Sequence, residues 1–505
     1  MRIRLSAVVA IAISLIYFPL RFGQEVELTL AFCFHSSYTC PMLLGRVVPV
    51  SLILFCWFGS ALPATFVRKI GSEVDERALG VISLSEGGFL VVGTLETVPD
   101  TAVACILRVD SLGFPVWLRR VVEPGASTRI HAVCLKGVDT ILVAGEQKGA
   151  RIDCDMYAAE LDSSGNIRWQ RTWGAVGAND VALGVCPSHD GGWLVVGYTL
   201  EFGQHDVRVA LIDSMGNVQL GRVLRTPQAD LVYAASKAAN RGYALVGTKW
   251  VSGSRYTDAL LLLLNDTCGV ARTRFFGDIL WDGFVAVTSA ADSGLALVGF
   301  STTESTGNDI FLLLTDSTGQ GMRQRRYGQR QSDRGLAVAA ARDGFVIAGE
   351  TFRENGDGDA VLLRVDPSGF VCWERTDGGS GFDCLNSVVI LPDRGMIAVG
   401  QTWDDLTQTS DILLVRTDEW GTVGLADDPP SSEGNRPTVH CLRPSLGGIG
   451  AGSVRPARVM SVDGRIVLRL VGEGNWEEFD SVSGTLSSGV YIVQTAEGAL
   501  FRFVR

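Results

Sequence analysis

The sequence predicts an all-β fold made of seven similar units, because three marks recur along it at one spacing. The first mark is an Asp followed three residues later by Gly, which is typical of a tight turn. Successive Asp residues of this mark lie 50 to 53 positions apart. The turn pairs are Asp110/Gly113, Asp162/Gly165, Asp213/Gly216, Asp266/Gly269, Asp316/Gly319, Asp366/Gly369 and Asp418/Gly421.

The other two marks repeat with the same period. One is an Asp that opens the strand before each turn, and the other is a Gly that closes the preceding apolar strand. The strand-opening residues are Asp100, Asp155, Asp206, Asp258, Asp309, Asp359 and Asp411. The strand-closing residues are Gly93, Gly145, Gly197, Gly247, Gly299, Gly349 and Gly400.

Each unit is predicted to contain four strands, which in the third unit are 181–188, 192–199, 206–213 and 217–224. The second and third strands are continuous apolar runs, so both of their faces need cover. Four-stranded blades arranged around an axis supply that cover, since each blade lies between two others. The prediction is a seven-bladed β-propeller over residues 65–424. A β-solenoid is the alternative, but its repeats are usually shorter.

Local details of the units support this interpretation. The Asp-Gly-Gly at 190–192 predicts the turn between first and second strands, where Gly tolerates a positive φ. The second unit has Val-Asp-Thr at 138–140 instead. The strand-closing Gly is expected to end its strand or to let a neighbouring blade approach closely. Residues 65–71 resemble the segments that close other units, so we expect them to complete the last blade and remove an exposed edge.

The repeat resembles that of bacterial secreted β-propeller proteins, in its glycine turn, apolar run and Asp-x-x-Gly-x-x-x-Trp phrase, over about 360 of the 505 residues. This phrase, at 110–117, 162–169 and 366–373, also resembles the repeats of pyrroloquinoline-quinone propellers. Only three of seven units keep the Trp, however, and the adjacent cysteine pair common in those dehydrogenases is absent. Kelch repeats place their Gly pair after the apolar strand, so they also match poorly.

The N-terminus carries two apolar runs, at 5–18 and 47–64. The second follows Arg46 and ends in small residues, which predicts a signal peptide cleaved near Ala61 or Ala64. We therefore treat residues 1–64 as a signal-peptide region and expect translation to start at Met42. Two membrane segments are the alternative, but each run is short for a spanning helix. Both interpretations predict export.

The C-terminus predicts a second, smaller unit. Residues 425–437 are rich in Pro, Ser, Gly and charge, as in a linker. Residues 438–505 predict a small β-sandwich with a hairpin at 463–465. Leu486, the Ser-Gly-Val-Tyr at 488–491 and a basic final strand resemble the C-terminal (Por) sorting domain of type IX secretion cargo, over about 65 residues.

That resemblance implies the type IX secretion machinery as a partner and a secreted or outer-surface location, with the tail cleaved. The family often begins with Pro-Asn-Pro, whereas Arg-Pro-Ser stands here at 443–445. An ordinary terminal β domain is the alternative.

Composition excludes some functions. The formal net charge is −11, which repels phosphate backbones and disfavours nucleic acid as a partner. The eleven cysteines show no zinc-site spacing. Free buried thiols are expected at Cys105, Cys154 and Cys186, and a Cys372–Cys384 bridge only in an oxidising compartment.

No catalytic or metal motif stands out. The histidines lack metal spacing, and they are His35, His131, His189, His205 and His440. The repeated Asp residues are interpreted as structural rather than as a ring of calcium or acid–base groups. Residues 354–359 place oxygen ligands at alternate positions, which suits calcium, but the downstream Glu of an EF-hand is missing and a polar loop is favoured. No cofactor is expected.

The ligand site is expected on one face of the propeller. The second-to-third loops and the connections between blades emerge together there, and we name it the loop face; these segments are predicted to be longer and more varied than the other turns. Aromatic side chains among Asp and Arg suit sugars or a peptide. The expected binding residues are His205, Trp250, Arg255, Tyr256, Trp281, Arg353 and Trp403.

The sequence thus predicts an exported, monomeric, non-enzymatic binding module that meets a surface glycan or protein ligand. Two alternatives stay open. One is an extracellular enzyme that degrades polysaccharide or peptide at the loop face. The other is a purely structural surface or adhesion protein.

Overall fold

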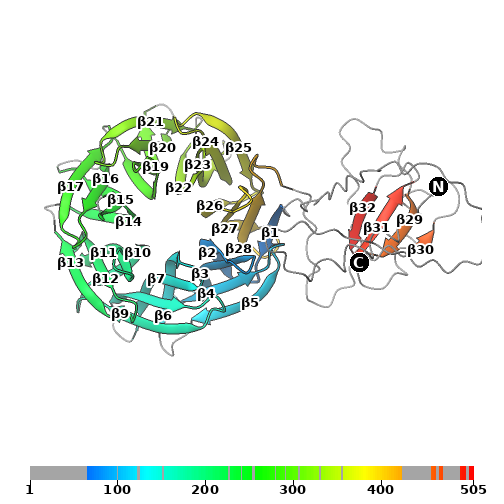
Figure 1. Ribbon diagram of the computed structural model, residues 1–505, viewed down its shortest axis with the longest axis horizontal. Helices are drawn as coiled ribbons and strands as arrows, with labels where there is room; N and C mark the ends of the chain where they lie inside the picture. The colour runs from blue at the N-terminus through cyan, green and yellow to red at the C-terminus, as the bar shows by residue number, and fades with distance from the viewer. Residues whose placement is uncertain are drawn as a thin grey trace, which may run out of the picture. The chain divides into compact units, whose positions relative to one another are not determined.

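The computed structural model describes residues 65–423, with gaps at 99–100, 122–125, 150–152, 226–227, 240, 253–255, 279, 291, 305–306, 329–330 and 354–356, and the backbone of four strands between 456 and 504. The described residues form a seven-bladed β-propeller, which confirms the predicted fold (Figure 1). They contain no helix, hence none able to cross a bilayer. The signal-peptide region, Met42 and the linker at 425–437 lie outside them.

Each blade is an antiparallel four-stranded sheet whose strands follow one another along the chain. Blade 1 comprises β2 (Asp75–Ser83), β3 (Phe89–Val98), β4 (Thr101–Val109) and β5 (Pro115–Val121). Blade 2 comprises β6 (Ser127–Lys136), β7 (Thr140–Lys148), β8 (Cys154–Leu161) and β9 (Ile167–Trp173). Blade 3 comprises β10 (Asn179–Pro187), β11 (Trp193–Glu201), β12 (Gln204–Ile212) and β13 (Val218–Leu224). Blade 4 comprises β14 (Asp230–Lys237), β15 (Tyr243–Trp250), β16 (Thr257–Leu264) and β17 (Val270–Phe276).

The last three blades repeat the pattern. Blade 5 comprises β18 (Asp282–Ser289), β19 (Leu295–Thr303), β20 (Gly307–Thr315) and β21 (Gly321–Tyr327). Blade 6 comprises β22 (Asp333–Ala341), β23 (Gly344–Phe352), β24 (Gly358–Val365) and β25 (Val371–Asp377). Blade 7 comprises β26 (Cys384–Ile390), β27 (Met396–Asp404), β28 (Thr409–Thr417) and, from the start of the described chain, β1 (Phe66–Ile70).

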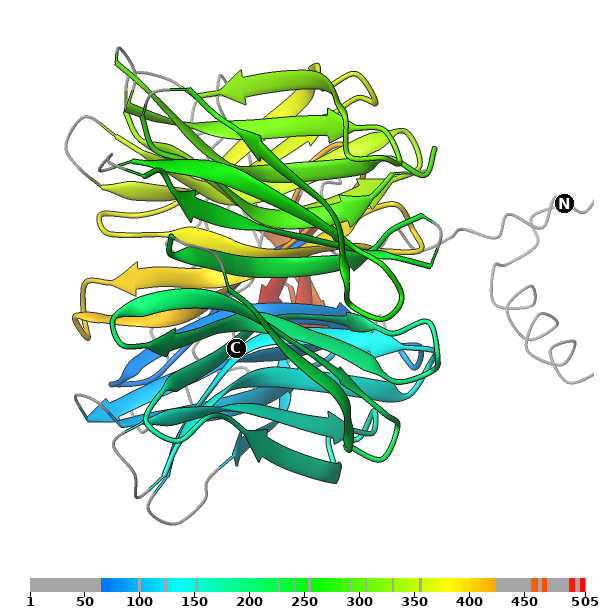
Figure 2. The same ribbon diagram turned by 90° about the vertical axis from the view of Figure 1, so that its left-hand side faces the viewer.

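Strand β1 closes the ring. It pairs antiparallel with β28, with Arg68 opposite Leu414, and so supplies the outer strand of blade 7. The first strand of each blade packs against the first strand of the next, from β2 round to β26 and back to β2. Figure 1 shows the ring and Figure 2 shows it edge-on, with the strands turning at the two faces. The predicted closure by 65–71 is confirmed.

The hydrophobic core is divided into wedges between blades. Each of the seven clusters of buried apolar residues in the described part draws on two adjacent blades. Because successive side chains of a strand point to opposite faces, Leu90 and Val92 of β3 pack toward blade 2, while Phe89 and Val91 pack toward blade 7. This explains the continuous apolar runs. The fourth strands are largely exposed in blades 1 to 6, as in β13, β17 and β21, whereas β1 of blade 7 is largely covered.

Every first strand carries a β-bulge, and the strand-closing Gly lies opposite it. In blade 3 the register shifts between Ala182 and Gly184, and Gly197 pairs with Ala182. A Cβ on Gly197 would lie 1.9 Å from the carbonyl oxygen of Val181. The expectation for this Gly was therefore wrong on two points, because the residue lies inside its strand and the close approach comes from its own blade.

The Asp-x-x-Gly turn is confirmed at six of its seven predicted positions. In blade 1 the Asp110 carboxylate accepts the backbone N–H groups of Leu112 and Phe114, at 2.8 and 2.9 Å. In blade 4 the prediction was off by one residue: Asn265, not Asp266, accepts the equivalent bonds, and Cys268 takes the left-handed conformation with φ 56°. An Asn side chain provides the same acceptor as Asp, so the turn survives the change.

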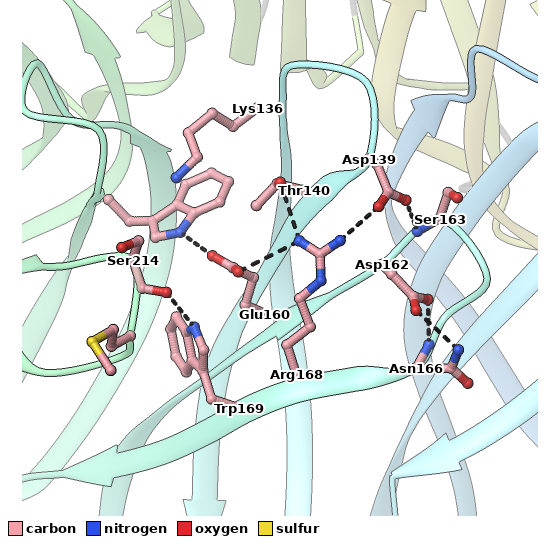
Figure 3. Close-up of polar contacts among 12 residues, drawn as sticks. Lys136, Asp139, Thr140, Glu160, Asp162, Ser163, Asn166, Arg168, Trp169 and Ser214 are labelled. Carbon is pink, nitrogen blue, oxygen red and sulfur yellow. Dashed lines mark hydrogen bonds and ion pairs between the residues drawn. The ribbon is translucent and has the colours of Figure 1, made fainter.

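The Trp of the Asp-x-x-Gly-x-x-x-Trp phrase joins neighbouring blades. Trp169 in β9 lies against Gly216 in the turn of blade 3, and its indole N–H donates to the carbonyl of Ser214 at 3.1 Å (Figure 3). Where the Trp is missing, other side chains span the same interface. Arg272 donates to the carbonyl of Thr318, and Phe66 of β1 packs on Gly113.

The irregular turn of the second unit has its own network. The Asp139 carboxylate accepts the backbone N–H of Ser163 at 2.6 Å and pairs with Arg168 at 2.6 Å. Arg168 also approaches the buried Glu160 at 3.7 Å, and Glu160 accepts the indole N–H of Trp193 at 2.9 Å (Figure 3). These side-chain contacts hold a turn of three residues in which Gly137 has the positive φ, at 70°.

The glycine turn at 190–192 has the positive φ that was predicted, because Gly191 has φ 83°. In blades 4 and 5 a residue other than Gly takes it. Arg241 and Ser293 take the positive φ in their turns, at 59° and 68°. The Gly that follows has a second, unpredicted reason, which is space: a Cβ on Gly242 would lie 2.5 Å from the carbonyl oxygen of Leu264, and one on Gly192 2.0 Å from that of Ile212.

All cysteines in the described residues are free. Cys105 and Cys186 are buried, and Cys154 is half-buried. Cys372 is exposed on β25 whereas Cys384 is buried on β26, so the bridge between them does not form in the structure.

The tail is described by its backbone alone. Strands β29 (Pro456–Ser461), β30 (Ile466–Arg469), β31 (Val490–Thr495) and β32 (Leu500–Val504) form one antiparallel sheet in the order β30-β29-β31-β32. Strands β29 and β30 pair around the predicted hairpin at 463–465. The second sheet of the predicted sandwich stays a prediction.

Candidate functional site

The loop face is built as the antiparallel pairing requires. Each blade's second and third strands join there, and each fourth strand passes there to the next blade. The second-to-third loops vary from two residues at 202–203 to six at 251–256, whereas the other turns mostly have five, as at 188–192 and 213–217. The second-to-third loops are therefore more varied, as predicted, but not uniformly longer. The connections between blades, mostly five residues long as at 174–178, are neither longer nor more varied, so the prediction was wrong for them.

Three of the predicted binding residues meet in one aromatic cluster, which we define as Trp250, Tyr256 and Trp281. The ring of Trp281 lies 5.4 Å from that of Trp250 and 6.0 Å from that of Tyr256, edge to face in both pairs. The rings come from the end of β15, the residue before β16 and the residue before β18. About 37% of Trp250 and Tyr256 and 38% of Trp281 stay exposed. The cluster spans blades 4 and 5.

Backbone hydrogen bonds hold the cluster in place. The N–H of Trp250 donates to the carbonyl of Ala229 at 3.0 Å, and the Thr302 N–H donates to that of Trp281 at 2.8 Å. The N–H of Val251 donates to Tyr256 at 3.1 Å, closing the loop that carries this ring. The rings are therefore anchored to neighbouring strands.

The remaining predicted residues lie elsewhere. Arg353 forms an ion pair with Asp359 at the second-to-third loop of blade 6. Trp403, in β27 of blade 7, packs on Gly381. Its backbone N–H donates to the Asp383 carboxylate at 3.2 Å. Arg255 and residues 354–356 of the predicted polar loop lie outside the described residues. The predicted site is thus several places on one face.

The sequence analysis missed a polar pocket between blades 2 and 3, which has a volume of about 310 Å³. The ends of β7 and β11 and the starts of β6, β8 and β10 form it. Its lining residues are Ser127, Arg129, Glu146, Lys148, Cys154, Asn179, Val181, Tyr198 and Leu200. No repeated mark points to them, because they share no position common to all blades.

Charges and hydrogen bonds organise this pocket around Glu146. Arg129 Nη1 lies 3.3 Å from its Oε1 atom, and His131 Nε2 lies 4.0 Å from the same oxygen. The Cys154 thiol donates to Glu146 at 3.6 Å, and burial, followed by the charge of Glu146, raises the pKa of that thiol to about 12. Burial lowers the pKa of His131, which favours the neutral imidazole. Cys154 is therefore a protonated thiol at neutral pH.

His205 is connected to this pocket rather than to the aromatic cluster. Its ring lies 5.0 Å from that of Tyr198, edge to face. Burial lowers the pKa of His205 and raises the pKa of Tyr198 to about 12, so both side chains are neutral at pH 7. The next turn exposes Phe202 completely at φ 51°.

A second set of buried acidic residues was also missed. It stands at the start of the first strands, as at Asp180, Asp282 and Asp383, which are fully buried. In six blades an acidic residue lies 16 or 17 positions before the strand-closing Gly, which is the signal that was available. Asp180 accepts the N–H of Ala175 at 2.7 Å, and so caps the connection between blades.

The predicted strand-opening Asp is displaced in blade 1. In the other blades this Asp lies opposite the residue that comes two positions after the strand-closing Gly. In blade 3, for example, Asp206 pairs with Thr199. Val103 holds that place in blade 1, opposite Leu95, and Asp100 lies outside the described residues. No group of three or more His, Cys, Asp or Glu side chains in the described part of the chain is arranged to hold a metal.

Comparisons with known proteins reach only the fold. No protein-family model and no curated protein matches the sequence. The chain is similar in structure to the WD40 domain of Neurospora crassa Pan2, with 10% identity, 67% of this chain and 88% of that chain covered, and a TM-score of 0.40. It is similar to the polysaccharide lyase Uly1, with 10% identity, 68% of this chain and 90% of that chain covered, and a TM-score of 0.43. It is also similar to puromycin hydrolase, with 13% identity, 83% of this chain and 58% of that chain covered, and a TM-score of 0.46.

Proposed function

We propose that this protein is an exported, non-enzymatic binding module that holds a surface glycan or a protein ligand against the aromatic cluster of the loop face. The observation that carries the proposal is the partial exposure of three rings on anchored backbone across two blades. Exposed Trp and Tyr side chains supply large contact area at little cost in conformational entropy, and they dominate binding surfaces.

The size of the cluster limits the affinity that it gives alone. Each of the three residues keeps 37–38% of its surface exposed. Covering three such surfaces contributes on the order of 5 kcal/mol before the cost of association. That cost is about 4–15 kcal/mol, so further contacts or several linked ligand units are needed for stable binding. A repeating polymer meets this need.

The chemistry of the loop face favours binding over catalysis. Two carboxylates, Glu96 and Glu146, approach the guanidinium of Arg129 at 3.9 and 3.3 Å, which compensates their charge. The nearby Cys154 is held as a neutral thiol by its pKa of about 12, and a nucleophilic cysteine needs a lowered pKa. These features weigh against the hydrolase alternative.

Delivery to the surface is part of the proposal. The signal-peptide region, followed by a tail that resembles type IX sorting domains, supports passage through the type IX machinery. Cell fractionation with mass spectrometry of both mature ends tests this. We expect an extracellular protein that starts after Ala61 or Ala64, whereas an intact cytoplasmic chain would contradict it.

The binding role is tested on arrays of polysaccharides and peptides with the mature protein. We expect Trp281→Ala to weaken binding at least tenfold, because Trp281 contacts both other rings. Trp420→Ala is the matched control, since Trp420 is 69% exposed in a turn on the opposite face. Absence of any ligand would favour the structural alternative, and equal losses in both variants would place the site elsewhere.

A further inference from the structure

The polar pocket between blades 2 and 3 holds hydrogen-bond donors that the protein leaves unused. Among the described residues, the Lys148 ammonium, the Tyr198 hydroxyl and the Asn179 amide N–H₂ have no hydrogen-bond partner. The orientation of the Asn179 amide is defined, because its oxygen accepts the backbone N–H of Cys154 at 3.1 Å. Three donors thus line one cavity.

The charge of the lining adds a preference to this geometry. Arg129 is paired with Glu146 and Glu96, at 3.3 and 3.9 Å, so Lys148 is the cation of the lining without an acidic partner among the described residues, in a chain whose net charge is −11. A ligand with a single negative charge compensates Lys148. A doubly charged phosphate would leave a negative charge beside Glu146, which is unfavourable in a partly buried site.

The pocket also offers acceptors and a limited volume. Glu146 accepts bonds from Arg129 and Cys154 and keeps lone pairs for ligand hydroxyls. Val181 and Leu200 add apolar surface. About 310 Å³ is near the lower limit for small-molecule sites, which suits one sugar ring.

From these features we propose that this pocket binds a small carboxylate that also carries hydroxyl groups, of which a hexuronic acid is the simplest case. The carboxylate meets Lys148, Tyr198 and Asn179, and the hydroxyls donate to Glu146. This site is separate from the aromatic cluster, on other blades and with other chemistry. It therefore stands or fails independently of the binding role proposed for that cluster.

The test is calorimetric titration of the full mature chain with D-galacturonate, D-galactose and D-galactose 6-phosphate. Galactose differs from galacturonate by a neutral CH₂OH in place of the carboxylate, so it isolates the charge. We expect galacturonate to bind at least tenfold more tightly than either other sugar. A further titration with trigalacturonate shows whether the pocket takes a free sugar acid or a residue within a polymer. Binding of either compound supports the proposal.

Two variants locate the binding. Lys148→Met is expected to weaken galacturonate binding about tenfold, and Tyr198→Phe, which removes only a hydroxyl, severalfold. Lys237→Met is the matched control, because Lys237 is an exposed lysine at the far end of a first strand, β14. Equal binding of galactose, tighter binding of the phosphate, no binding of either sugar acid, or full affinity in both pocket variants would overturn the proposal.

Discussion

At the scale of single residues, Asp411 shows how burial sets the chemistry of one carboxyl. It is the third residue of β28, is 7% exposed, and its Oδ1 has no hydrogen-bond partner among the described residues. Burial first, and then the charges of Asp404 and Glu76, raise its pKa to about 6, although Lys69 partly offsets them. Ionising this carboxyl in the folded protein is therefore costly.

This pKa predicts how stability changes with pH. The folded pKa of about 6 exceeds the ordinary value of 3.8, so the folded state binds the proton more tightly. Stability from this group is complete below about pH 4 and is lost as pH rises through 6. We expect Asp411→Asn to be more stable than the natural protein at pH 8 by about 2 kcal/mol, and nearly equal at pH 4. Urea unfolding at both pH values measures this.

Asp266→Asn is the control for that measurement. Asp266 is exposed beside a turn that Asn265 anchors, so this change removes a carboxyl that the fold does not bury. Parallel profiles for the natural protein and Asp411→Asn would show that the carboxyl is already compensated in the folded state.

At the scale of elements, the bulged first strand is the feature that all seven blades share. In each blade a Cβ on the strand-closing Gly would lie within 2.0 Å of a first-strand carbonyl oxygen. Backbone atoms of a paired strand cannot move aside as a flexible side chain can. The bulge therefore requires Gly at this position, because no side chain fits there. The bulge itself bends the first strand and increases its local twist.

A methyl group at this position should disrupt the blade. We expect Gly197→Ala to destabilise the protein by about 3 kcal/mol or more, because it forces β10 and β11 apart at Val181. Gly149→Ala is the control, since a Cβ there meets nothing within 4 Å. Denaturant unfolding compares the two, and equal small effects would contradict a rigid bulge.

At the scale of the whole molecule, seven interfaces of similar kind hold the ring, and one of them depends on a strand from the other end of the domain. Phe66 of β1 is 2% exposed in the core between blades 7 and 1, where it packs on the turn glycine Gly113. It occupies the place that Trp117 and Trp169 take at other interfaces. Closure therefore uses the same contact as the rest of the ring.

Loss of this contact should loosen the whole propeller. We expect Phe66→Ala to cost about 3–5 kcal/mol and to increase aggregation, because detachment of β1 exposes the edge of β28. Phe202→Ala removes the same atoms from a fully exposed residue and should be nearly neutral. Unfolding midpoints and light scattering report both effects, and a neutral Phe66→Ala would mean that the ring closes without β1.

The parts of the fold that could be predicted are those set by contacts between residues close together in the sequence. The seven units, their four strands and the closing strand could be predicted because turns such as Asp110 to Phe114 are made by bonds within five residues. The same marks misplaced the blade 4 turn by one residue, since Asn265 makes the bonds that Asp266 was expected to make.

The sequence by itself determined the number of blades, the order of their strands and the way the ring closes, because each is written in a local pattern that repeats. Only the tertiary structure decided which side chains meet. It brought together Trp250, Tyr256 and Trp281, assembled the pocket around Glu146, and kept Cys372 apart from Cys384. These contacts join different blades or strands, so they follow from the packing of the ring and leave no periodic trace in the chain.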